Sequence, residues 1–459
     1  MPSQGYDHDS GLAEPPATGR PVRCRALLGT GAHRIGAVLP MALAPALTGL
    51  LLLHLLWPTH WAARGEGRRW LVLADSATLV SVGLIELFLL VNAVAVAYAV
   101  SVAEDPPPVA PGPGAAAAFL TTYVPGREPL SAVRATLEGA VRMRRSGPLD
   151  VWLLDEGDDP EARMLCAELG VHHFTRLGVP EWNREQGPHR AGAVHGNHNA
   201  WLAKHGGDYE IFFPVDTGHV PRPDFLERVA GHFRDPDVAF VVGRGARGSG
   251  AGALAGVRRS GFDGLVQRAG NRHGTPVLAG TGAVVRVAAL RQAGGFHDSA
   301  SVELTTGFGI HRLRNPLTGH PWRSLRTPDV PADGEGTVSA ARRPDRSPWA
   351  GGVLPREYGK ALFRVEPGRL LSYTLMLLHR PVAVVTCLLG PLSLLLACTH
   401  AAMGVRAALP VVTALVPGVV LVVTVLRERG SRLVEDRSRT KRPVQEAEPA
   451  LAATPAGGS

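Results

Sequence analysis

Cysteine is scarce in this chain, with four residues among 459: Cys24, Cys166, Cys387 and Cys398. They lie far apart in unrelated contexts and show neither the paired spacing of a zinc site nor that of a disulfide framework. A cysteine metal centre and a disulfide-stabilised scaffold are therefore not expected. Free thiols, in a reducing compartment or in a bilayer, are the favoured interpretation.

Charge is also low. Charged residues make up 19% of the chain and hydrophobic residues 45%, a balance that predicts a folded domain combined with membrane segments. The formal net charge of +8 comes mostly from arginines that are scattered or dense beside apolar segments. That pattern favours a membrane-flanking role over binding to nucleic acid, which is not expected as a partner.

Residues 35–57 contain no Lys, Arg, Asp or Glu. At about 1.5 Å per residue, a helix of this length spans roughly 35 Å, enough for a bilayer core. A signal peptide is the alternative, but the segment starts late, is long for such a peptide and precedes a second apolar segment. That second segment, 78–100, contains Glu86, which either marks a translocation path or makes one interhelical hydrogen bond in its neutral form.

Two further apolar segments follow at 381–398 and 407–426. Arginines precede the first segment and follow the last. Four spans with this distribution predict that both termini and the large middle domain lie on the cytoplasmic side of the plasma membrane. The expected organisation is a disordered basic N-terminus (1–34), two transmembrane helices (35–100), a Pro-rich linker (101–118), the middle domain (119–354), an interfacial helix interrupted at Pro367-Gly368 (355–371), two transmembrane helices (372–427) and a disordered tail (428–459).

The middle domain alternates apolar strand-like runs with amphipathic helix-like stretches until about residue 295, and becomes loop-rich from 297 to 349. This alternation predicts an α/β domain with a mostly parallel sheet covered by helices. Ligands of such sheets bind at the carboxyl ends of the strands.

Two carboxylates follow strand-like runs at that edge: Asp155 closes VWLLD and Asp216 closes IFFPVD. Together they could hold a nucleotide, one accepting hydrogen bonds from the base or ribose and the other binding a divalent metal on a diphosphate. The alternative is that each is a turn or cap residue after a strand.

Other candidates are polar or small residues near predicted helix starts and strand ends. The segment HRAGAVHGNHNAWL places His195, Asn197 and Asn199 before or within a helix, where they suit the sugar or phosphate side of a donor. In VLAGTGAVVR, small residues would let the backbone approach a ligand closely. The remaining candidates are Gly280 and Thr281 in that strand, Glu303 as a general base, and Trp349 as a platform for a sugar ring.

Several of these segments together resemble a family 2 glycosyltransferase of the membrane-embedded, cellulose-synthase-like kind. The resemblance covers about half the chain in consecutive order, through TTYVPGREPLSAVRATLEGA, VWLLDEGDDPE, VHGNHNAWL, FFPVDTGHVPRPDFL, GTGAVVRVAALRQAGGF and NPLTGHPWRSLRTPDVPADGEG. It implies a GT-A-like fold and inverting transfer from a nucleotide-sugar, with a UDP-sugar favoured, to a glycan or polysaccharide acceptor. It also implies Mg²⁺ or Mn²⁺ as cofactor and, as partners, membrane lipid and other synthase subunits.

The chain departs from the family pattern at four places. Gly218 stands where the metal motif has its second Asp, which leaves Asp216 with His219 as a possible additional ligand. The Glu-Asp pair reads Val302-Glu303, so the base would be Glu303. Of the Gln-x-x-Arg-Trp acceptor motif only Trp349 is retained.

The fourth departure is in the Asn-containing element, where the family's Lys reads Val194 with His195 beside it. Loss of a carboxylate weakens binding of a divalent metal, and a base displaced by about 1 Å can cost on the order of a hundredfold in rate. Two functions from different classes therefore stand: an active inverting glycosyltransferase, and a catalytically impaired glycosyltransferase-like partner or regulator of an active synthase.

Overall fold

The computed structural model describes residues 24–27, 42, 43, 45–47, 49, 50, 52, 53, 69–112, 116–144, 147–244, 265–278, 282–333, 353–361 and 364–376. The chain divides into two compact units. One comprises residues 1–41 and 94–385, and the other residues 42–93 and 386–459. The candidate site lies in the first unit.

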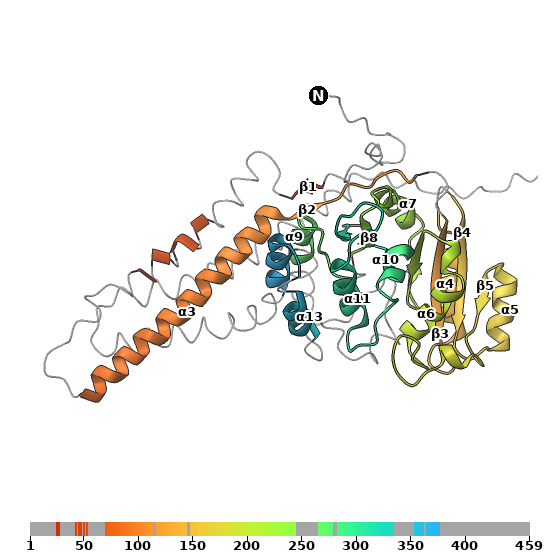
Figure 1. The fold of residues 1–459 in the computed structure, drawn as a ribbon, viewed down its shortest axis with the longest axis horizontal. Coiled ribbons are helices and arrows are strands. Elements are labelled where there is room, and N and C mark those ends of the chain that lie inside the picture. Colours follow the sequence, from red (N-terminus) through yellow and green to blue (C-terminus); the bar gives the residue numbers. More distant parts are fainter. Residues whose placement is uncertain are drawn as a thin grey trace, which may run out of the picture. The chain divides into compact units, whose positions relative to one another are not determined.

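A seven-stranded sheet forms the centre of this unit (Figure 1). Its strand order is β10-β8-β9-β6-β3-β4-β5, and within it only β9 runs antiparallel to its neighbours. The α/β fold with a mostly parallel sheet is therefore confirmed. The strands are β3 (Ala117–Tyr123), β4 (Leu149–Asp155), β5 (His172–Phe174), β6 (Ile211–Pro214), β8 (Val238–Val242), β9 (Ala283–Arg286) and β10 (Arg323–Arg326).

Helices cover both faces of the sheet because its central strands bury apolar side chains on both sides. In β3, Phe119 faces one core and Leu120 the other, as the two-residue period of a strand requires. The first core is closed by α4 (Leu130–Val141), α5 (Pro160–Leu169) and α7 (Phe225–Ala230). The second is closed by α6 (Val194–Lys204), α10 (Val287–Gln292) and α11 (Val302–His311).

Helix α5 shows how the local sequence sets an element's bounds. Asp159 precedes the helix and its Oδ1 accepts a hydrogen bond from the Glu161 amide at 2.9 Å. Pro160 fills the first helical position, where no amide hydrogen is needed. Gly170 ends the helix with a φ of 66°, a left-handed conformation that glycine adopts without steric cost.

Short elements complete the unit. Two small antiparallel pairs join β1 (Arg25–Ala26) with β2 (Glu104–Asp105), and β7 (Val220–Pro221) with β11 (Ala332–Asp333). The remaining helical elements are η1 (Pro180–Trp182), η2 (Gly206–Asp208), η3 (Gly231–Arg234), α9 (Gln267–Asn271), α13 (Val353–Ala361) and a helix over 367–376.

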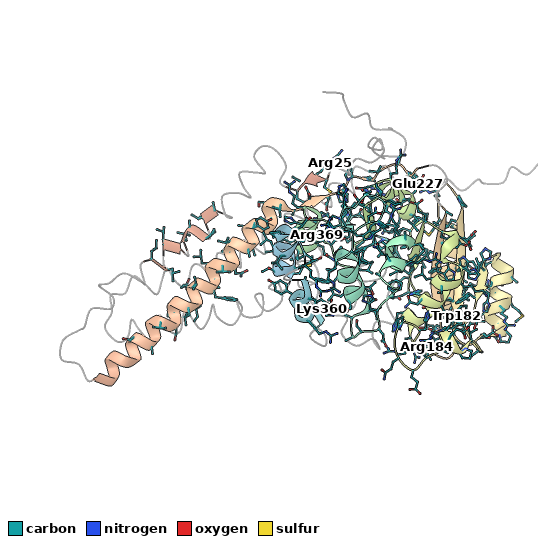
Figure 2. The ribbon with its side chains drawn as sticks, viewed as in Figure 1. Arg25, Trp182, Arg184, Glu227, Lys360 and Arg369 are labelled. Carbon is teal, nitrogen blue, oxygen red and sulfur yellow. The ribbon has the colours of Figure 1, made fainter. Side chains whose placement is uncertain are left out.

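The last helix packs on the sheet domain through buried polar groups. The Tyr373 hydroxyl lies 3.0 Å from Nδ1 of His311, and Arg369 (labelled in Figure 2) donates to the His311 carbonyl at 3.1 Å. This helix starts at Pro367, and the preceding break spans 364–366. The expected interruption is present but lies directly before Pro367 instead of at Pro367-Gly368, because proline suits the first turn of a helix.

A second correction concerns residues 297–349, which were expected to be loop-rich with only short elements. They contain the ten-residue helix α11, which carries Glu303. Its sequence, VELTTGFGIH, has two glycines and two threonines, which have low helix propensity, and eight of its residues are buried. Tertiary packing, rather than propensity, forms this helix.

Helix α3 (Arg69–Val102) contains the single candidate membrane span within the described part of the chain, Val80–Val102, judged by length and composition. It coincides with the expected second span. The first expected span is described only in part, and the last two lie outside the described residues. Glu86 is fully buried in the second unit, which fits either of its two interpretations.

Candidate functional site

Strand β4 delivers Asp155 to the carboxyl edge of the sheet, where the side chain is fully buried. Its Oδ1 accepts from the Gly157 amide at 2.9 Å, and its Oδ2 from the Asp159 amide at 2.6 Å. Nε2 of His173, on neighbouring β5, lies 3.1 Å from the same Oδ2. Asp155 thus organises the loop after β4, and its binding to a nucleoside stays a prediction.

A group able to hold a metal forms around this residue. Ligand atoms of Asp155, Asp158 and His173 all lie within 4.8 Å of one another. The Arg163 guanidinium pairs with both carboxylate oxygens of Asp158, so much of the charge of this group is already balanced. The sequence prediction missed Asp158 and His173. The available signal was the acids after the strand together with a His on the next strand.

The second predicted acid, Asp216, follows β6 and starts a tight turn. The His219 amide donates to the Asp216 carbonyl at 3.2 Å, and Gly218 has a φ of 87°, as a type II turn requires at its third position. The Gly218 amide donates to Oγ1 of Thr136 on α4 at 3.1 Å. The positive φ explains the glycine at this position. Close packing does not require it, since a Cβ here would meet nothing within 4 Å.

The residues of this turn can be tested as ligands for a divalent ion. Asp216 is partly exposed, and Nδ1 of His219 is a buried atom with no hydrogen-bond partner among the described residues. An unpaired imidazole nitrogen beside a carboxylate-bearing turn fits a metal ligand set with nitrogen and oxygen donors. Gly218 adds no ligand, so the chain itself offers at most two side chains here.

Arg176 organises the loop that leads into α6, in which Figure 2 labels Trp182 and Arg184. The guanidinium is fully buried and binds Glu156 through two hydrogen bonds of 3.1 and 2.5 Å. It also donates to the carbonyls of Trp182 at 2.7 Å, Arg190 at 3.0 Å and Ala193 at 3.3 Å. Such extensive pairing offsets the cost of burying a charge.

Gly196, in the first turn of α6, is required by this packing. A Cβ there would lie 2.3 Å from the Arg190 carbonyl oxygen and 2.6 Å from Nη1 of Arg176. The loop and the helix start can therefore come together only around glycine. Arg176 was missed by the sequence prediction, since an Arg after a strand carries no distinctive signal.

Three predicted donor residues lie on α6. Asn197 is fully buried; its Nδ2 donates to the Leu154 carbonyl of β4 at 3.2 Å, and its Oδ1 has no hydrogen-bond partner within the described ranges. Asn199 uses its amide within the protein, donating to the Pro188 and Phe296 carbonyls and accepting from the Phe296 amide, at 2.7 to 2.8 Å. These hydrogen bonds hold α6 against residue 296.

His195 is 4% exposed, and its Nε2 lies 3.5 Å from Oδ1 of Asp298 without making a hydrogen bond to any described group. Burial is the largest influence on this imidazole and lowers its pKa. The Asp298 charge and a hydrogen bond with the Gly187 backbone oppose that shift, whereas Arg190 and Arg176 add to it.

Glu303 lies in the first turn of α11 and is partly exposed. The loop before α11 contacts the start of α6 through Asp298, so the candidate base and the candidate donor helix belong to one packed region. Asp216 follows β6, and β3 separates that strand from β4 and Asp155. Gly280, Thr281 and Trp349 lie outside the described residues, so their predicted roles stay predictions.

By sequence, the chain is similar to cellulose synthases. No family model matches the chain. It is 38% identical over 125 residues to the cellulose synthase catalytic subunit [UDP-forming] of Xanthomonas axonopodis pv. citri (strain 306), a match that covers 27% of this chain and 15% of that protein. It is 28% identical over 219 residues to cellulose synthase 1 of Komagataeibacter xylinus, covering 44% of this chain and 13% of that protein. The chain thus spans only a small part of these relatives' length.

Among solved structures, the chain is similar to a mannosyltransferase from Pyrobaculum calidifontis in complex with GDP-Man and Mn²⁺. The TM-score is 0.41 at 15% identity, covering 84% of this chain and 98% of that one. Glucosyl-3-phosphoglycerate synthase from Mycobacterium tuberculosis gives a TM-score of 0.33 at 13% identity, covering 48% and 72%. The sequence relatives confirm the resemblance expected from the motifs: this chain is related to the family 2 glycosyltransferases of the cellulose-synthase type.

Proposed function

We propose that the chain is an inverting glycosyltransferase that moves a sugar from a nucleotide-sugar, with a UDP-sugar favoured, to a glycan or polysaccharide acceptor. One observation carries the proposal: the start of α6, tied to the end of β4, buries two polar atoms without hydrogen-bond partners in the described structure, Nε2 of His195 and Oδ1 of Asn197. Unsatisfied buried polar groups cost free energy, and a ligand that pairs with them would recover it.

The reaction assigns one role to each predicted residue. The Glu303 carboxylate takes the proton of an acceptor hydroxyl, whose oxygen bonds to the anomeric carbon as the bond from that carbon to the diphosphate oxygen breaks. The electron pair leaves with the nucleoside diphosphate, and the configuration at the anomeric carbon inverts. Asp155 binds the nucleoside, and Trp349 is the platform for a sugar ring of the acceptor.

The remaining assignments concern the donor sugar and phosphates. His195, Asn197 and Asn199 line this part from α6, with Asn199 acting through the Phe296 backbone that it holds. Gly280 and Thr281 would let the backbone approach the donor closely.

Asp216 and His219 would hold a Mg²⁺ or Mn²⁺ ion, the donor phosphates completing its shell. Such an ion neutralises charge that develops on the leaving diphosphate. The chain's own contribution is the rigid turn that presents both side chains, fixed to α4 through the Gly218 amide. The fit is partial, because Gly218 supplies no carboxylate.

A glycosyltransferase-like partner of an active synthase is the second candidate function. It is favoured by Gly218 and by the use of both Asp155 oxygens within the loop after β4. Both candidates share the proposed arrangement of a GT-A-like cytoplasmic domain in a multi-pass plasma-membrane protein, with lipid and synthase subunits as partners. Helix α3, which contains an apolar stretch of 23 residues, supports that arrangement.

Titration of the full chain with UDP, with and without Mn²⁺, separates the two candidates. The enzyme is expected to bind UDP more tightly with the metal, and the Asp216→Asn variant to lose that gain. Binding that is absent or indifferent to metal would favour the partner function. Asp237→Asn is a suitable control, because Asp237 precedes β8 at the opposite edge of the sheet.

A further inference from the structure

Asp298 lies in the loop between α10 and α11 and in none of the motifs that suggested the family. Its Oδ2 accepts a hydrogen bond from the Gly187 amide at 3.0 Å. Its Oδ1 lies 2.8 Å from Nη1 of Arg190 and 3.5 Å from Nε2 of His195. All three partners belong to the loop that enters α6 or to its first turn, more than 100 residues earlier in the chain.

A second connection joins the same two loops. The Asn199 side chain exchanges hydrogen bonds with both backbone groups of Phe296 and donates to the Pro188 carbonyl. A single packed region therefore contains the segments 187–199 and 296–298. Asn199 connects the two segments through hydrogen bonds between neutral groups, whereas Asp298 connects them through an ion pair with Arg190.

Asp298 and the other charged groups near the His195 imidazole shift its pKa in opposite directions. Arg190 and Arg176 lower the pKa of His195, as burial does, whereas Asp298 raises it. The Asp298 side chain is 17% exposed, so water screens this interaction less than it would at the surface. The imidazole is held between the Gly187 backbone and this carboxylate.

We propose that Asp298 is a positioning residue for donor binding, which fixes the loop 184–193 and orients His195 beside the helix that bears Glu303. The inference rests on the proposed function, because the ligand whose binding depends on the ordered loop is the nucleotide-sugar donor. Asp298 itself needs no contact with the donor. It acts through Arg190, Gly187 and His195.

The first test does not depend on activity. Hydrogen exchange of the full chain is measured for Asp298→Ala, for Asp298→Asn, and for Asp237→Asn as the control. Asp237 is matched, with 14% exposure and a histidine, His320, at 3.0 Å. We expect exchange of the segment 184–193 to rise by about tenfold in Asp298→Ala, since it loses a charged acceptor, and to be unchanged in the control.

Asp298→Asn keeps an oxygen for the Gly187 amide but removes the charge, so a smaller rise in exchange is expected. This variant also carries the test if Asp298→Ala fails to fold. Wild-type exchange in the segment 184–193 of both folded variants would overturn the inference.

The second test separates positioning from a merely structural role. UDP affinity is measured at pH 6 and pH 8 for the wild type, Asp298→Asn and the control. We expect Asp298→Asn to bind about tenfold more weakly, with any pH dependence displaced to lower pH because the pKa of His195 falls. Wild-type affinity at both pH values would overturn the positioning role. Absence of UDP binding by the wild type would instead contradict the proposed function, and the exchange result would still decide the contacts of Asp298.

Discussion

Replacing Arg176 by Met should destabilise the protein strongly, because it removes the cation from a buried ion pair. Arg176 is fully buried and Glu156 is 12% exposed, and three backbone carbonyls in addition accept hydrogen bonds from the guanidinium within 3.3 Å. Removing one partner of such a pair costs about 3–5 kcal/mol, since the other charge stays buried and unpaired. Unfolding of the full chain in detergent, followed by circular dichroism, measures the change.

The chain offers a control with the same chemistry on its surface. Arg134 binds Glu168 through two hydrogen bonds of 2.6 Å, but the side chains are 43% and 57% exposed. Water screens this pair, so Arg134→Met should change stability far less than Arg176→Met. The double variant Arg176→Met, Glu156→Gln should recover part of the loss by removing the unpaired charge. Equal effects of the two Arg variants would show that burial does not set the strength of the pair.

Two further predictions follow from the described contacts. Gly218→Ala and Gly218→Asp should each lower the free energy of unfolding by about 1–2 kcal/mol, because a residue with a Cβ is strained at a φ of 87°. Only Gly218→Asp should bind UDP more tightly than the wild type in the presence of Mn²⁺. Equal UDP affinities of the two variants would argue against a metal at this turn. His232 is fully buried, and burial lowers its pKa to about 4. Because the folded-state pKa lies below the unfolded value of about 6.5, its contribution to stability is present above pH 6.5 and is lost as pH falls toward 4. Chemical denaturation at pH 7 and pH 5 should therefore show that His232→Gln loses less stability at the lower pH than the wild type does. Identical losses of stability would show that His232 does not contribute to the pH dependence.

The central strands could be predicted from sequence because each is a short apolar run that ends at a polar or turn residue. The runs closed by Asp155 and Asp216 are β4 and β6, and both end at the predicted edge of the sheet. Buried parallel strands have this pattern whatever their neighbours are. The order of strands and the antiparallel β9 depend on tertiary packing and left no comparable trace.

The contacts around α6 could not be predicted, for a physical reason. Asp298 and Gly187 are 111 positions apart, and Arg176 binds carbonyl groups, which are the same in every residue. Asn199 was predicted to bind the donor, whereas in the structure its amide contacts Pro188 and Phe296, a role that motif spacing does not distinguish from ligand binding. The sequence therefore indicated on which elements these residues lie, but not which groups each side chain contacts.

The most direct test of the proposed activity is turnover of radiolabelled UDP-sugars by membranes that contain the full chain. Glu303→Gln should lose turnover by a factor on the order of a hundred or more, because a base in the transition state contributes roughly 10²–10⁴-fold. Glu210→Gln is the control, since Glu210 precedes β6 at the end opposite to Asp216. We expect turnover in the wild type and the control and its loss in Glu303→Gln; full turnover in Glu303→Gln would exclude Glu303 as the base of the proposed reaction.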